Sequence, residues 1–259
     1  MKIPLYQIDA FTGHLFKGNP AAVCPLDEWL NDETLLHIAA ENNLSETAFF
    51  VKEGMGYRLR WFTPEVEVDL CGHATLAAAF VIFNYIDPSL NRVVFATQSG
   101  NLAVTTDGKL LAMDFPSRKP AACSPPHDLI KGLGGSPVEV LRSRDYFVVY
   151  SSEEEIKNLK PDMSLLSKLD ALGVIVTAKG NNVDFVSRFF APGAGIPEDP
   201  VTGSAHSSLI PYWAEKLVKN RLHALQVSKR GGELYCELNG DRVMISGLAV
   251  KYLEGFMEL

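Results

Sequence analysis

One stretch of this chain occurs in two similar copies, and this internal repeat constrains the fold more than any other feature. Residues 60–79 read RWFTPEVEVDLCGHATLAAA, and residues 188–208 read RFFAPGAGIPEDPVTGSAHSS. Each copy begins with an arginine, two aromatic residues, one further residue and a proline, and then runs through a turn-rich acidic stretch to a glycine. Self-similarity of this kind indicates that one structural unit occurs twice.

The similarity continues beyond the two glycines, Gly72 and Gly203. The arginines of the two copies are 128 residues apart and the glycines 131, so the second copy has three more residues in its loop. Each glycine is followed by an apolar segment of helix length, at residues 74–86 and 205–217. Both segments are too apolar on all sides to be surface helices, so we expect two buried helices.

Strand-forming segments accompany both helices in the same order. VVFATQSGNLAVTTDGKLLAMDF follows the first helix, and ALQVSKRGGELYCELNGDRVMISG follows the second. The dipeptides Asp107-Gly108 and Asn239-Gly240 predict two-residue hairpin turns at matching places. Each copy is therefore predicted to be an α+β unit in which a barrel-like mixed β-sheet surrounds a central buried helix.

The boundary between the two units is expected in the proline-rich segment PSRKPAACSPPH, residues 116–127, which has the composition of a linker. This divides the chain into two pseudo-symmetric domains, residues 1–117 and 118–259. Similar halves commonly pack about a pseudo-two-fold axis, and we expect the ligand in the crevice between them.

Charge and cysteine content exclude several classes of protein. The net charge is −7 without any cluster of lysine or arginine, which disfavours a nucleic-acid partner. No apolar run reaches membrane-spanning length, and MKIPLYQIDAF predicts a strand rather than a signal peptide. The four cysteines are scattered without a CxxC pair, which favours a reducing cytoplasm over disulfides or a zinc site.

The two glycine turns predict an anion site. A helix that starts at a glycine offers free backbone N–H groups and the positive end of its dipole, so Gly72 and Gly203 together suit a small carboxylate-bearing substrate. His73 and Ser204 occupy equivalent positions beside the glycines, and Asp199 lies shortly before the second one. These side chains are placed where acid–base chemistry on such a substrate would need them.

Glu46 is a further candidate because it is the lone acid in the apolar segment SETAFFV. Its counterpart in the second copy is Val174, so the repeat is broken where only one half would need a carboxylate. An acid in such a strand more often faces solvent, and the pattern alone leaves both roles open.

Cys71 is a weaker candidate. It directly precedes Gly72, but its counterpart in the second copy is Thr202, so a pair of thiols is missing. A hydrolase pair of Cys71 and His206 lacks the usual orienting acid, and a buried unreactive thiol is the favoured interpretation.

Four motifs occur in order along the chain: GNPAAV at 18–23, SETAF at 45–49, FTPEVEVDLCGHAT at 62–75 and EDPVTGSAH at 198–206. Together they resemble the PhzF-like family of phenazine biosynthesis. This resemblance implies the fold of diaminopimelate epimerase and proline racemase, with the last ten or so residues packed back on the first half. It also implies a homodimer that needs no cofactor and no metal.

The resemblance further implies the roles of individual residues. Glu46 would carry the proton as the general acid/base. The other catalytic residues would be His73, Asp199 and Ser204. The substrate-binding residues would be Asn19, Gly72, Thr202 and Gly203.

The founding activity of that family isomerises a dihydro-hydroxyanthranilic acid by moving a proton between ring carbons. We therefore expect a cytoplasmic biosynthetic isomerase that moves a proton between carbons of a small carboxylate-bearing metabolite. Two alternatives stay open: an amino-acid epimerase or racemase, and a non-catalytic metabolite-binding protein on the same fold.

Overall fold

The computed structural model describes all residues 1–259, and the chain divides into two compact units. Unit 1 comprises Met1–Asp114 and Ser246–Leu259, and unit 2 comprises Phe115–Ile245. The chain therefore passes between the units twice, and its last strand belongs to the first unit. None of the helices is both long and apolar enough to cross a membrane.

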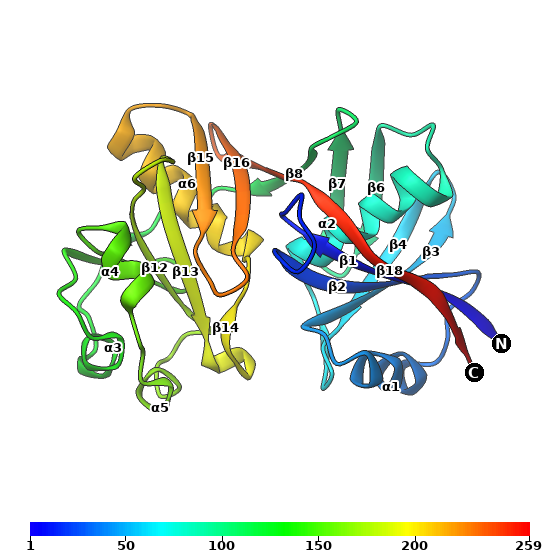
Figure 1. Ribbon diagram of the computed structural model, residues 1–259, viewed down its shortest axis with the longest axis horizontal. Helices are drawn as coiled ribbons and strands as arrows, with labels where there is room; N and C mark the ends of the chain where they lie inside the picture. The colour runs from blue at the N-terminus through cyan, green and yellow to red at the C-terminus, as the bar shows by residue number, and fades with distance from the viewer. The chain divides into compact units, whose positions relative to one another are not determined.

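Unit 1 is built on one mixed sheet. Its strands are β1 (Lys2–Ala10), β2 (Asn19–Leu26), β3 (Glu46–Glu53), β4 (Gly56–Phe62), β5 (Glu67–Val68), β6 (Arg92–Thr97), β7 (Gly100–Thr106), β8 (Leu111–Pro116) and β18 (Ala249–Glu258). Its helices are α1 (Asp32–Asn42), α2 (Gly72–Val81) and the π-helical η1 (Ile82–Ile86). Most neighbouring strands are antiparallel, but β2–β3 and β4–β6 are parallel. Figure 1 shows β18, in red, running beside β1, in blue.

Unit 2 also combines parallel and antiparallel strand pairs. Its strands are β9 (Ala121–Ala122), β10 (Glu139–Arg142), β11 (Tyr146–Val149), β12 (Val174–Lys179), β13 (Phe185–Ala191), β14 (Ile196–Asp199), β15 (Arg221–Gln226), β16 (Gly232–Asn239) and β17 (Arg242–Gly247). Its helices are α3 (His127–Leu133), α4 (Glu153–Asn158), α5 (Met163–Leu166), the 3₁₀ turn η2 (Pro192–Ala194) and α6 (Gly203–Leu217). Parallel pairs again occur twice, at β11–β12 and β13–β15.

The strands of the two units share one pairing pattern, as the repeat predicts. In unit 1 the strands β2, β3, β4 and β6 pair in the senses parallel, antiparallel and parallel, and β11, β12, β13 and β15 do the same in unit 2. A short strand pairs antiparallel with the third member in each unit, β5 with β4 and β14 with β13. The predicted α+β class with two similar halves is confirmed.

The two helices that follow the repeated glycines are buried in their units. Eight residues of α2 are buried, as are eleven of α6. Helix α2 consists mostly of alanine and other apolar residues, so it can be buried on most of its sides. Helix α6 contains Pro211 and ends at Val218 in the left-handed conformation. The predicted buried helices are confirmed, and each starts at its glycine.

The arginine at the start of each copy of the repeat forms the same bidentate ion pair with a glutamate in both units. Arg60 donates from Nε and Nη2 to the Glu67 carboxylate, both at 2.7 Å. Arg188 donates from the same two atoms to Glu198, at 2.7 and 3.0 Å. Each bidentate pair ties a long strand to the short strand after it. The loops that lead into α2 and α6 are therefore anchored in the same way.

Both hairpin-turn predictions are wrong in detail. The first hairpin turn spans four residues, 107–110, because the Asp107 side chain accepts hydrogen bonds from the N–H groups of Lys109 and Leu110. The second turn lies one residue later than predicted, at Gly240 and Asp241. The proline-rich segment predicted as the link contains the short strand β9, which pairs with β10.

Candidate functional site

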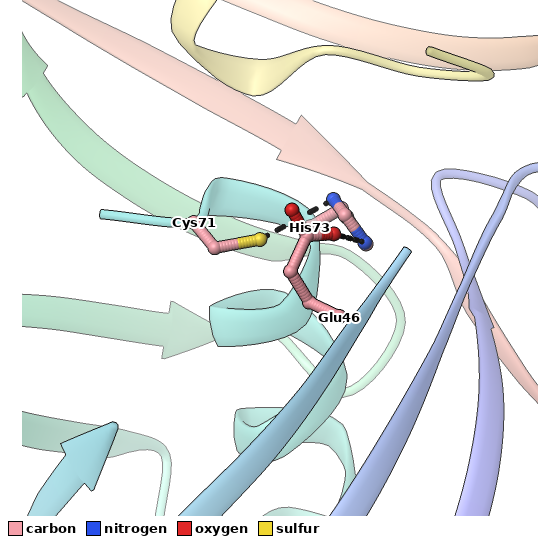
Figure 2. Close-up of side chains that lie close together, drawn as sticks. All are labelled: Glu46, Cys71 and His73. Atoms are coloured by element: carbon pink, nitrogen blue, oxygen red, sulfur yellow. Dashed lines mark hydrogen bonds and ion pairs between the residues drawn. The ribbon is translucent and has the colours of Figure 1, made fainter. Parts of the chain in front are cut away.

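Glu46 and His73 meet within unit 1. Glu46 is the first residue of β3 and its side chain is 19% exposed, whereas His73, the second residue of α2, is buried. Glu46 Oε2 lies 3.2 Å from His73 Nε2 (Figure 2). Both atoms are buried, and their contact is a close approach of two ionisable groups rather than an aligned hydrogen bond. Such a pair can hold a proton between its members.

The other nitrogen of the His73 ring is held by two neighbours. Asn19, the first residue of β2, is fully buried, and its Nδ2 lies 3.1 Å from His73 Nδ1. Cys71 Sγ lies 3.5 Å from the same nitrogen. Because the amide group of Asn19 donates, Nδ1 of the neutral ring accepts and the ring proton resides on Nε2. The neutral ring therefore presents its N–H to Glu46.

Burial and charge act on the His73 ring in opposite directions. Burial favours the neutral ring, but the negative charges of Cys71, when ionised, and of Glu46 raise the pKa of His73 well above 6.5. Burial raises the pKa of the Cys71 thiol to about 11, and the charge of Glu46 adds to this. Cys71 is therefore a protonated thiol at neutral pH. In either protonation state, His73 carries a proton on the nitrogen that faces Glu46.

Both buried helices leave their first amide groups without a side-chain cap. Cys71 precedes Gly72 at the start of α2, and Thr202 precedes Gly203 at the start of α6. Neither capping residue uses its side chain to accept from the first turn, and neither first turn contains an acidic residue. Free N–H groups and the positive end of the helix dipole favour an anion at such a place. Each helix start can thus serve a carboxylate.

The loop before α6 is fixed by hydrogen bonds around Thr202. Its Oγ1 donates to Asp199 Oδ2 at 2.5 Å, and its N–H donates to Gln226 Oε1 at 2.9 Å. Gln226 Nε2 in turn donates to the Asp199 carbonyl at 2.8 Å. No sequence motif points to Gln226, a buried residue at the end of β15 that reaches this loop because β15 pairs with β13. The result is a fixed position for the Asp199 carboxylate beside the start of α6.

Ser204 and His206 have different environments on α6. Ser204 Oγ accepts from Arg144 Nη2 at 3.2 Å. His206 is fully buried, and its Nδ1 donates to the Thr202 carbonyl at 2.8 Å. Burial lowers the pKa of His206 to about 4, so the ring is neutral and supports the helix start. Cys71 contacts His73 within unit 1, whereas His206 belongs to unit 2, so the Cys71–His206 hydrolase pair stays untested.

The structure assembles the predicted site residues into two groups, one in each unit. The group of unit 1 consists of Asn19, Glu46, Gly72 and His73. The group of unit 2 consists of Asp199, Thr202, Gly203 and Ser204. Their catalytic and binding roles, and the crevice expected between the halves, stay predictions.

Glu46, Cys71 and His73 also form a donor set that a divalent metal could use. One ligand atom from each residue lies within 4.8 Å of the others. A carboxylate, a thiol and an imidazole suit zinc, but Cys71 would first have to lose its proton. The same contacts serve proton transfer without a metal, so the predicted absence of a metal role stays a prediction.

Comparison with known proteins bears on the family. The family model described as phenazine biosynthesis-like protein, PhzC-PhzF, matches residues 8–255. An uncharacterized isomerase of Pseudomonas aeruginosa is 53% identical over 259 residues and covers all of both chains. Phenazine biosynthesis-like domain-containing protein 1 of Mus musculus is 41% identical, with 98% of this chain and 99% of its own covered.

Solved structures support the same assignment. The crystal structure of a PhzF-family phenazine biosynthesis protein from Enterococcus faecalis matches with a TM-score of 0.98 at 50% identity over all of both chains. A hydroxyproline epimerase from Agrobacterium vitis matches at 10% identity with a TM-score of 0.60, over 98% of this chain and 92% of its own. This distant match concerns the fold alone and agrees with the predicted epimerase-like fold. The chain belongs to the PhzF family of phenazine biosynthesis-like proteins, and it is an isomerase.

Proposed function

We propose that this isomerase moves a proton between two carbon atoms of a small carboxylate-bearing metabolite, and that Glu46 carries the proton. The observation that supports this most directly is the contact of Glu46 Oε2 with His73 Nε2 at 3.2 Å. Asn19 occupies the opposite nitrogen of the ring, so the ring cannot turn away without losing that bond. Glu46 is thus a carboxylate in close contact with an ionisable partner that carries a proton on the facing nitrogen.

The proposed reaction has two steps. The Glu46 carboxylate removes a proton from one carbon, and the electron pair of the broken C–H bond moves into the adjoining unsaturated system. The protonated Glu46 then returns that proton to a second carbon as the electrons move back. Atoms and electrons balance within substrate and enzyme, so no oxidant, reductant or cofactor is required.

The remaining groups would bind the substrate in this proposal. The uncapped amide groups after Gly72 and after Gly203 suit negatively charged oxygen atoms. Asp199 and Ser204 would hold other polar groups of the substrate, because both are fixed near the start of α6 by hydrogen bonds. His73, with its proton facing Glu46, would stabilise negative charge that develops on the substrate close to Glu46.

Proton exchange with solvent tests this proposal. The protein is incubated with a bacterial metabolite extract in heavy water, and deuterium uptake is followed by mass spectrometry. Glu46→Gln keeps the shape and hydrogen bonding of the side chain but cannot exchange a proton, so uptake should fall by ~10²–10⁴. Glu53→Gln, at the exposed far end of the same strand, is the matched control and should leave uptake unchanged.

Each outcome has a defined meaning. Unchanged uptake in a folded Glu46→Gln variant would transfer the role to another group. Binding without any uptake in the parent protein would favour a metabolite-binding protein, and uptake with inversion at a single carbon would favour an epimerase.

A further inference from the structure

The loop between β10 and β11 carries a charged residue to the first turn of α6. Arg144 Nη2 donates to Ser204 Oγ at 3.2 Å, and Ser204 is the second residue of that helix. The first turn of α6 has no acidic residue and no side-chain cap. A guanidinium group therefore stands beside amide groups that already favour an anion.

Arg144 is held in place by an unusual neighbour. Its Nε and Nη2 donate to Asp145 Oδ2 at 3.0 and 2.8 Å. The side chain of Asp145 is only 4% exposed, whereas that of Arg144 is 37% exposed. Surface arginines are seldom anchored by a buried carboxylate, because burial of a charge is costly unless the pair has a fixed geometry. The guanidinium is thus pre-positioned, and its Nη1 makes no hydrogen bond within the chain.

The repeat shows that this contact has a counterpart in unit 1. Asn19 lies two residues before Ala21, which pairs with Glu46. Arg144 lies two residues before Tyr146, which pairs with Val174, the counterpart of Glu46. Asn19, at the start of β2, and Arg144, in the loop just before β11, therefore lie the same number of residues before the paired positions.

Their contacts also correspond. Asn19 touches His73, the second residue of α2, and Arg144 touches Ser204, the second residue of α6. Asn19 and Arg144 thus both contact the start of the buried helix in their unit, but their side chains differ in charge. In unit 1 the residue is an amide that contacts the His73 ring, and in unit 2 it is a guanidinium group that is also paired with Asp145.

We propose that Arg144 is a specificity-determining residue that recognises the substrate carboxylate, together with Ser204 and the first amide groups of α6. A guanidinium group donates two hydrogen bonds to a carboxylate in a fixed geometry, which a neutral amide cannot accept equally well. This inference deepens the proposed function, on which it rests for the kind of substrate. The inference predicts that the protein binds an anionic ligand more tightly than a neutral one. This preference does not depend on proton transfer.

The test compares binding of anthranilate and of 2-aminobenzamide by titration calorimetry. The two probes share the ring and the amino group and differ in the carboxylate. The parent protein should bind anthranilate about 10- to 100-fold more tightly than the amide, as expected for hydrogen bonds to a charged group. Arg144→Gln should lose this preference. Arg142→Gln is the matched control, since Arg142 is a nearby arginine that pairs with Asp170, and it should keep the preference.

Two further variants keep the test decisive. If Arg144→Gln fails to fold because Asp145 is left buried and unpaired, the double variant Arg144→Gln/Asp145→Asn removes both charges and should show the same loss. The anion preference is read from binding alone, whereas the proton-transfer proposal is read from deuterium uptake in Glu46→Gln, so failure of one proposal and failure of the other are separate results. The inference is overturned if the parent shows no preference, if the folded Arg144 variants retain it, or if Arg142→Gln loses it equally.

Discussion

Replacement of Cys71 by serine should leave most of the isomerase activity, although this thiol contacts the ring of His73. Burial raises the pKa of the Cys71 thiol to about 11. At pH 7 only about one molecule in 10⁴ therefore carries the thiolate, the form that acts as a base. A mechanism that depended on this thiolate would forgo most of its rate at neutral pH.

The size of the expected effect follows from the geometry. The contact of Cys71 Sγ with His73 Nδ1 is 3.5 Å long, and a serine hydroxyl can replace it. Asn19 still holds the same nitrogen at 3.1 Å. We therefore expect deuterium uptake to fall by less than about tenfold, which corresponds to about 1.4 kcal/mol in the barrier.

The assay is solvent deuterium uptake between pH 6 and pH 9, for the parent, for Cys71→Ser and for Cys24→Ser as a control with another buried thiol. A thiolate base would make uptake rise about tenfold per pH unit across this range, because its population does so below pH 11. A rise of that kind in the parent, or a loss of more than about a thousandfold in a folded Cys71→Ser variant, would refute the reasoning and revive the epimerase alternative.

Three other outcomes are expected. The folded pKa of His206, about 4, lies below its ordinary 6.5, so its contribution to stability is complete above pH 6.5 and is lost as the pH falls toward 4; urea unfolding should show the parent losing up to about 3 kcal/mol more than His206→Gln over this range. Gly203→Val should weaken anthranilate binding in calorimetry, because a branched side chain shields the first amide groups of α6, and equal affinity would place the anion elsewhere. Treatment with EDTA should leave deuterium uptake unchanged, whereas micromolar Zn²⁺ should inhibit it through Glu46, Cys71 and His73, and loss of uptake on chelation would give the metal a catalytic role.

Most of the fold could be predicted from the repeat, because the features that determine it lie close together in the sequence. The glycines at the two helix starts and the all-round apolar character of the following segments determine where α2 and α6 begin and why they are buried. The paired arginines proved to have one shared role, as bidentate partners of Glu67 and Glu198. The three additional residues of the second loop lie between Arg188 and Gly203, where η2 occurs and β14 is longer than its counterpart β5.

The candidate site was only partly accessible to the same reasoning. Glu46 could be singled out because the equivalent position holds Val174. Contacts that depend on strand pairing could not be foreseen: Asn19 meets His73 because β2 lies beside β3, and Gln226 reaches Asp199 because β15 lies beside β13. Arg144 could not be foreseen either, because no short motif indicates that the loop between β10 and β11 contacts Ser204. The length of the first hairpin turn was misjudged because side-chain bonds of Asp107 outweighed the Asp-Gly signal.

The placement of β18 has a consequence for how the chain is made. Unit 2 is one continuous segment, Phe115–Ile245, but unit 1 needs both the first 114 residues and Ser246–Leu259. During synthesis, the strand β1 therefore waits for its partner β18 until all of unit 2 has left the ribosome. Its unpaired edge is open to wrong partners throughout that interval. A polypeptide released before residue 246 would keep a complete unit 2 and an unfinished unit 1, so truncation at the end of the chain should damage the domain at its beginning.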